Sequence, residues 1–184
     1  MRKTLGAFAV VGALSAAVPA FAAKADEAPK PAEITKVIKA DTPYGAGSMR
    51  MLFMSAYDAT LWTDAAHWSM QTPFAISMTY HFACDASDIV DRAISEMSHA
   101  NPTLSEATLE RYRSLIAGLF PGVKSGDEMT ALSTPDGTVR FFHDGRQTGQ
   151  VKDTSFAQAF FGIWLSPDTS EPGMRAGLLH LDNT

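Results

Sequence analysis

The chain has 184 residues, with 20 acidic side chains against 15 basic ones and a formal charge of −5 at pH 7. Phosphate backbones and anionic membrane surfaces repel such a chain, so the composition excludes nucleic acid as a partner. The single cysteine, Cys84, excludes an internal disulfide, and no two of the five histidines have a metal-ligand spacing, so neither a metal nor another cofactor is expected.

The first 22 residues have the features of a cleavable signal peptide. Arg2-Lys3 precedes an apolar stretch over 5–18, and Ala20-Phe21-Ala22 forms an A-x-A cleavage site. Pro19 ends the apolar stretch short of the roughly 20 residues that a bilayer-spanning helix needs, so no stable membrane anchor is expected. We predict export through the general secretory route to the periplasm and cleavage near Ala22, which would leave 13 basic against 20 acidic residues.

Residues 23–31 are polar and contain two prolines, so we predict a disordered leader followed by one folded domain over 32–184. Ile34, Val37 and Ile38 suggest a first short strand. The long apolar run over 49–62, preceded by Gly45 and Gly47, predicts a second strand. Alternating large apolar side chains over 74–82 predict a third.

Two amphipathic helices are expected next. Ser87 can cap the first, which ends near Asn101-Pro102, and the capping-box sequence Thr103 to Glu106 begins the second, which ends near Pro121. Because each helix has one apolar stripe, each should pack on a sheet with its other face in solvent.

The last third of the chain predicts three short strands and two helices. Pro135-Asp136-Gly137 and Asp144-Gly145 are turn sequences between the strands expected over 129–133, 139–143 and 147–151. Asp153 or Thr154 can cap an apolar helix over 155–165, and Pro172 suits the first position of a final short helix. The whole order predicts an α+β domain with helices packed on a mainly antiparallel sheet.

Several segments taken together resemble the chalcone isomerase-like family, specifically its small exported bacterial branch. The matching residues cover most of the chain from about 32 to 180 and are Ser55 to Trp62, Pro73-Phe74, Thr79-Tyr80, Phe120-Pro121, Gly126-Asp127, Arg140-Phe141-Phe142 and Phe160 to Pro167. The resemblance implies the fold of that family, an open-faced β-sandwich. In it a layer of helices covers a large curved antiparallel sheet, with a ligand cleft between them.

The resemblance implies two kinds of function. Some members are plant enzymes that close a flavanone ring by intramolecular conjugate addition without a metal or redox cofactor, and others bind fatty acids without catalysis. In the enzymes an arginine stabilises the anionic nucleophile and the enolate, and here the candidate that the resemblance implies is Arg50, which matches that position or a neighbouring one. The alternative for Arg50 is an edge-strand arginine paired with a surface carboxylate.

Other residues of the expected cleft bear on whether the chain is an enzyme or a non-catalytic binding protein. Tyr57 and Tyr80 could present hydroxyls to a ligand, with ordinary core packing as the alternative. The Tyr and Asn that the enzymes carry in the segment entering the first long helix have no counterpart in Asp85-Ala86-Ser87-Asp88 or Ile94-Ser95-Glu96. The nine methionines could line a cleft that adapts to an apolar ligand, or simply fill the core.

We therefore expect an exported, non-catalytic protein that binds a small, largely apolar molecule, for which fatty-acid-like and carboxylate-bearing compounds are candidates. The alternative is a cofactor-independent isomerase, an intramolecular lyase, acting on an enone-like or phenolic substrate through Arg50 with Tyr57 or Tyr80. A third hypothesis is an interaction module whose open sheet face docks a protein partner.

Overall fold

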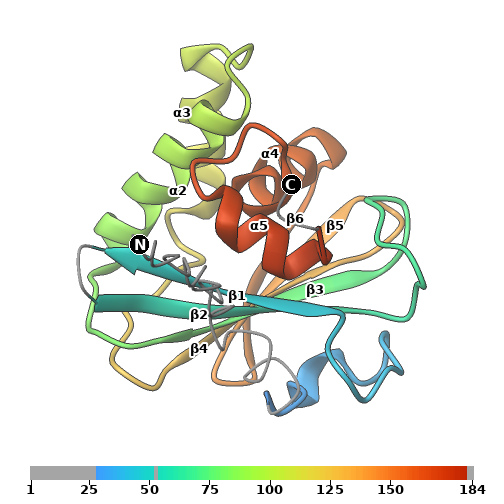
Figure 1. Ribbon diagram of the computed structural model, residues 1–184. Coiled ribbons are helices and arrows are strands. Elements are labelled where there is room, and N and C mark those ends of the chain that lie inside the picture. Colours follow the sequence, from blue (N-terminus) through green and yellow to red (C-terminus); the bar gives the residue numbers. More distant parts are fainter. Residues whose placement is uncertain (1–27, 52–53, 182–184) are drawn as a thin grey trace, which may run out of the picture.

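The computed structural model describes residues 28–51 and 54–181, and the predicted signal peptide lies outside these ranges. Six antiparallel strands form one sheet in which each strand pairs with the next along the chain (Figure 1). The strands are β1 (Gly45–Met51), β2 (Met54–Thr63), β3 (Phe74–Tyr80), β4 (Glu128–Ser133), β5 (Thr138–His143) and β6 (Arg146–Lys152). This confirms the predicted α+β class and the antiparallel sheet.

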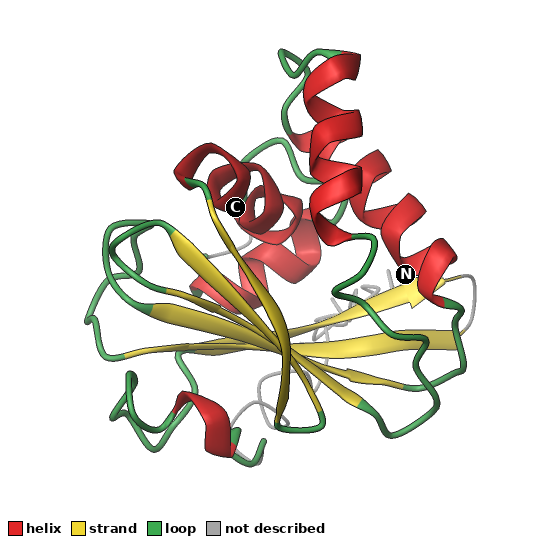
Figure 2. Cartoon of the chain, turned by 180° about the vertical axis from the view of Figure 1, so that it is seen from behind, coloured by secondary structure: helices red, strands yellow, loops and turns green. Residues whose placement is uncertain are grey.

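Helices cover one face of the sheet, as the views from both sides show (Figures 1 and 2). They are α2 (Ala86–Ala100), α3 (Glu106–Ile116), α4 (Thr154–Leu165) and α5 (Pro172–Leu179). Eight of the 12 residues of α4 are buried, so this helix is the centre of the layer. The Phe160 ring of α4 contacts the rings of Phe120 and Phe141, which places the main core between sheet and helices.

The helix caps agree with the sequence analysis in part. Asp153 caps α4, because its Oδ1 accepts a hydrogen bond of 3.0 Å from the backbone N–H of Phe156. Ser105 rather than Thr103 caps α3, with its Oγ accepting from the backbone N–H of Thr108 at 3.2 Å. The N-cap of α2 is Asp85 instead of Ser87, since Ser87 already lies inside the first turn.

The prediction of a first short strand at Ile34, Val37 and Ile38 was wrong. A 3₁₀ helix, η1 (Ala32–Ile34), and a following turn take its place, and the backbone N–H of Ile38 donates to the Ile34 carbonyl at 2.9 Å. The four-residue spacing therefore puts Ile34 and Ile38 on one side of a helical turn. Both are fully buried in a second apolar cluster with Trp62 and Leu132, on the sheet face opposite the helices (Figure 1).

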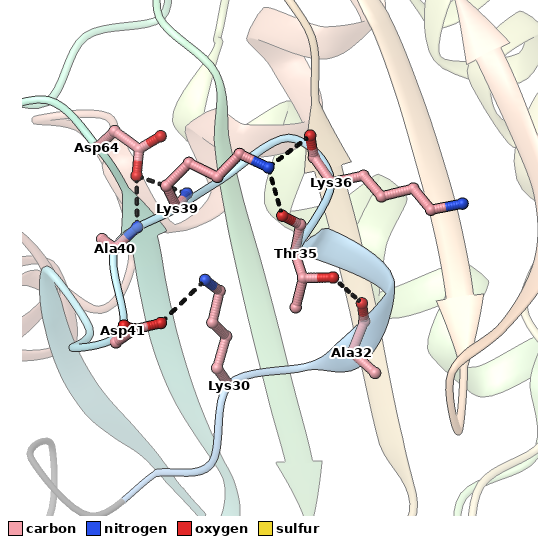
Figure 3. A network of polar contacts seen from close by, with 8 residues as sticks. All are labelled: Lys30, Ala32, Thr35, Lys36, Lys39, Ala40, Asp41 and Asp64. Atoms are coloured by element: carbon pink, nitrogen blue, oxygen red, sulfur yellow. Dashed lines mark hydrogen bonds and ion pairs between the residues drawn. The ribbon is translucent and has the colours of Figure 1, made fainter.

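Polar contacts fix this N-terminal segment to the sheet (Figure 3). Asp64, just after β2, accepts hydrogen bonds from the backbone N–H groups of Lys39 at 2.7 Å and Ala40 at 2.6 Å. Lys30 Nζ lies 3.5 Å from the Asp41 carboxylate. The predicted leader is thus described from residue 28 onward, where it covers apolar side chains of the outer sheet face.

The single long strand predicted over 49–62 was also wrong. Two strands, β1 and β2, occupy this region and pair with each other, with Gly45 opposite Leu61 and Met49 opposite Tyr57. The run of large apolar residues contains no glycine, proline or Asn-Gly signal that would announce the change of direction. The number of strands agrees with the prediction only because the second strand found in this region compensates for the predicted strand that is absent at Ile34.

Close packing of α5 against β1 closes one side of the helix layer. A Cβ atom at Gly177 would overlap the carbonyl oxygen of Ala46, and one at Gly45 would overlap the carbonyl oxygen of Leu178. Glycine at these positions lets the helix backbone approach the strand backbone directly. In the described part of the chain, the helices are too short or too polar to span a membrane.

Candidate functional site

A cavity of about 350 Å³ lies between the sheet and the helices. Its apolar wall combines side chains of β1–β4, α2, α4 and the connecting loops, namely Met49, Ala56, Met78, Phe82, Ile89, Ala93, Phe120, Met129, Phe160, Ile163 and Trp164. The predicted ligand cleft between sheet and helices thus has a counterpart in a cavity with a largely apolar lining.

A β-bulge shapes the sheet side of the cavity. The register of β1 against β2 shifts between Met49, which pairs with Tyr57, and Arg50, which pairs with Ser55. Ala56 is therefore the extra residue on β2, and a bulge re-aims the side chains around it. Ala56 and Tyr57 both line the cavity, although neighbours in a regular strand point to opposite faces.

Two phenols, Tyr57 and Tyr80, lie side by side in the cavity. They are direct partners across β2 and β3, with ring centroids 5.6 Å apart. Burial raises the pKa of Tyr57 to about 12 and also raises the pKa of Tyr80. Both hydroxyls stay protonated at neutral pH, so each can donate a hydrogen bond to a ligand.

Trp164 of α4 positions the Tyr57 hydroxyl. Its indole Nε1 donates a hydrogen bond of 2.9 Å to the Tyr57 oxygen, which leaves the phenolic hydrogen available for another acceptor. The Tyr80 hydroxyl makes no hydrogen bond with a described residue. The two phenols therefore differ, one fixed from the helix layer and one held only by packing.

Charged and polar residues form the rim of the cavity, which comprises Asp88, Arg92, Glu96, Ser170 and Glu171. Arg92 and Glu96 are one helical turn apart on α2, and Arg92 Nη2 lies 2.7 Å from Glu96 Oε1. Ser170 donates to the other Glu96 oxygen at 2.5 Å. The Arg92 side chain is 55% exposed and that of Glu96 only 12%, so the pair spans the boundary between solvent and cavity.

Cys84 and three methionines complete the lining. Met49, Met78 and Met129 come from three different strands, so some of the methionines do line the cleft. Cys84 is a free thiol, and partial burial raises its pKa, so it is not an activated nucleophile. The flexible and polarizable methionine side chains give the cavity a wall that can adjust to an apolar ligand.

The structure brings together two of the three predicted site residues. Tyr57 and Tyr80 line the cavity, whereas Arg50 is exposed and does not. The reason is the register of β1, where Met49 takes the inward position and the next side chain points to the other face. Arg50 therefore lies outside the lining of the cavity.

No role in the site was assigned from the sequence to Arg92, Glu96, Glu171 or Trp164. A signal for the α2 pair was present, since Arg92 and Glu96 flank the apolar stripe of α2 that contains Ile89 and Ala93. The position of Glu171 depends on how α5 packs, which no local pattern encodes.

A separate polar cluster joins Asp127, His143 and Asp144, whose possible ligand atoms lie within 4.8 Å of one another. His143 Nε2 lies 3.1 Å from Asp127 and 3.7 Å from Asp144. The backbone N–H of Lys124 and the ring of His143 lower the pKa of Asp127. These contacts agree with Asp127 as a turn residue, and none of the three lines the cavity.

Comparisons with known proteins agree with this architecture. The model of the chalcone isomerase-like family matches residues 42–180. The crystal structure of a fatty-acid binding protein from Arabidopsis thaliana is similar, with a TM-score of 0.56 at 9% sequence identity, covering 75% of this chain and 86% of that chain. At this identity the likeness establishes the fold alone. No curated protein sequence matches.

Proposed function

The chain belongs to the chalcone isomerase-like family, and from this premise we propose that it binds a small, largely apolar molecule in the cavity between sheet and helices, without catalysing a reaction. The observation that carries the proposal is the cavity itself. Its volume of about 350 Å³ lies near the lower end of the range of small-molecule sites. Its mostly apolar wall with two phenolic donors matches the usual make-up of such sites.

The arrangement of charged groups supports binding over an isomerase. The resemblance assigned the catalytic arginine to Arg50, which does not line the cavity. Arg92 does line it, but its guanidinium is paired with Glu96. In the enzymes an arginine stabilises the developing enolate, whereas Tyr57 and Tyr80 supply hydrogen-bond donors here without a positive charge. A fatty-acid binding protein with the same fold further supports an apolar ligand.

We also propose that the mature chain works in the periplasm. The support is the sequence of the first 22 residues, from Arg2-Lys3 to Ala20-Phe21-Ala22. Fractionation of a Gram-negative host that expresses the full chain, followed by N-terminal sequencing, tests this. A periplasmic product that begins at or near Ala23 supports export, whereas a cytoplasmic product with Met1 or Arg2 at its end contradicts it.

Native mass spectrometry of the freshly purified mature protein tests the binding function. We expect a co-purifying apolar molecule that is released on denaturation and a 1:1 complex with 1-decanol added to the emptied protein. A protein that purifies empty and also fails to bind decanol contradicts the proposal.

A further inference from the structure

The charges on the rim of the cavity are unequal. Three carboxylates, those of Asp88, Glu96 and Glu171, stand against one guanidinium, that of Arg92. The whole chain is acidic as well, with a formal charge of −5. An anionic head group would therefore meet a net negative rim as it enters.

The charge of the one guanidinium at the rim is already balanced by a carboxylate. Arg92 lies 2.7 Å from Glu96, and Ser170 holds the second oxygen of the same carboxylate at 2.5 Å. A ligand carboxylate that approached Arg92 would have to share its positive charge with Glu96, so two carboxylates would compete for one guanidinium. The rim therefore offers no ready anchor for an anion.

The interior is no better suited to an anion. Tyr57 and Tyr80 lie against an apolar wall, and burial is the main cause that raises the pKa of Tyr57; Glu171 and Glu96 raise it further, while the Trp164 hydrogen bond and Arg92 lower it. The same desolvation and the same charges would act on a carboxylate placed there.

Glu171 is a carboxylate at the rim that is available to pair with a cation. It is half-buried, lines the cavity and forms no ion pair with any residue in the described ranges. Asp88, exposed at another point of the rim, forms none with them either. A positively charged group at the rim could pair with Glu171 while its apolar chain fills the cavity.

We propose that the cavity selects an apolar molecule that carries a cationic head group, such as a long-chain amine, over the carboxylate of the same chain length. The selection comes from the rim, where Glu171 attracts the cation and the Arg92–Glu96 pair carries no net positive charge to attract an anion. This inference rests on the proposed binding function and specifies the head group that the cavity accepts.

Isothermal titration of the mature protein with decylamine, 1-decanol and decanoate at pH 7 tests the proposal. Decylamine should bind about tenfold more tightly than decanoate, with decanol between them, and should displace decanol competitively. Equal or tighter binding of decanoate overturns the selectivity while leaving the binding function intact. Failure of all three to bind overturns both.

Two matched variants separate the rim from the overall charge of the protein. Glu171→Gln should reduce the ratio of the two affinities by about two- to fivefold. Glu110→Gln removes the same charge from α3, away from the cavity lining, and should leave the ratio unchanged. If both variants reduce the ratio equally, the preference comes from net charge and the assignment to Glu171 is wrong.

Discussion

The indole Nε1 of Trp164 donates a hydrogen bond of 2.9 Å to the hydroxyl of Tyr57, two residues separated by 107 positions in the chain. This contact joins α4 to β2 inside the cavity, so the helix layer and the sheet share a polar link at the site where a ligand would lie. The two walls of the cavity are therefore joined by a defined hydrogen bond as well as by packing.

Removing this link should cost stability. Tyr57→Phe leaves the Trp164 N–H without its acceptor and should lower the free energy of unfolding by about 1 kcal/mol, measured by urea denaturation. Tyr80→Phe removes a hydroxyl that makes no hydrogen bond with a described residue and should change stability much less. Equal losses in the two variants would show that the hydrogen bond contributes nothing specific.

The contact between α5 and β1 should tolerate no side chain at Gly177. A methyl group there overlaps the Ala46 carbonyl, so Gly177→Ala should lower the free energy of unfolding by about 1–3 kcal/mol. Gly173→Ala lies in the same helix with no neighbour within 4 Å and should be neutral or stabilising by up to about 1 kcal/mol. A harmless Gly177→Ala would mean that α5 does not sit as close to β1 as described.

Glu128 should make stability fall as the pH rises. Burial, with the carboxylates of Glu33 and Asp144, raises its pKa from 4.5 to about 7. The folded state thus holds a proton that the unfolded state releases, so this stabilising contribution is present below pH 4.5 and is lost as the pH rises through about 7.

The Glu128→Gln variant isolates this effect, because the amide cannot ionise. Its Tm should exceed that of the natural chain at about pH 8, and the difference should shrink at about pH 4. Thermal denaturation at the two pH values measures this. A Tm difference that does not change with pH would argue that Glu128 is not the group responsible.

Arg50 should have no part in binding an uncharged ligand. It lies outside the cavity lining, so Arg50→Ala should change the affinity for decanol by no more than about twofold in calorimetry. A large loss of affinity in this variant would restore the cleft position that the family resemblance first assigned to it.

Several elements could be predicted because their signals are local. The Asp144-Gly145 turn has positive φ at both residues, 47° and 75°, the conformation that this sequence favours between two strands. Asp153 and Pro172 mark the start of the last two helices in the same direct way. In each case the residue type itself determines the backbone conformation or the hydrogen bond.

Other features depend on long-range contacts and could not be predicted. Ile34, Val37 and Ile38 are an exception, because their i, i+3, i+4 spacing is a local helical signal and only their burial against Trp62 depends on the sheet. The positions of the cavity residues do depend on long-range contacts. Tyr57 and Tyr80 were candidates before the structure was known, while Arg92 and Glu171 come to the same cavity only through the packing of α2 and α5 over the sheet.

Filling the cavity is the most direct test of the account. Ala93 of α2 lines the cavity, whereas Ala107 of α3 is exposed and does not, so Ala93→Phe and Ala107→Phe add the same ring in two different places. The titration uses decanol, and circular dichroism verifies that both variants fold. We predict that Ala93→Phe abolishes binding and that Ala107→Phe binds like the natural chain. Unchanged decanol binding in a folded Ala93→Phe variant would contradict the assignment of the ligand to this cavity.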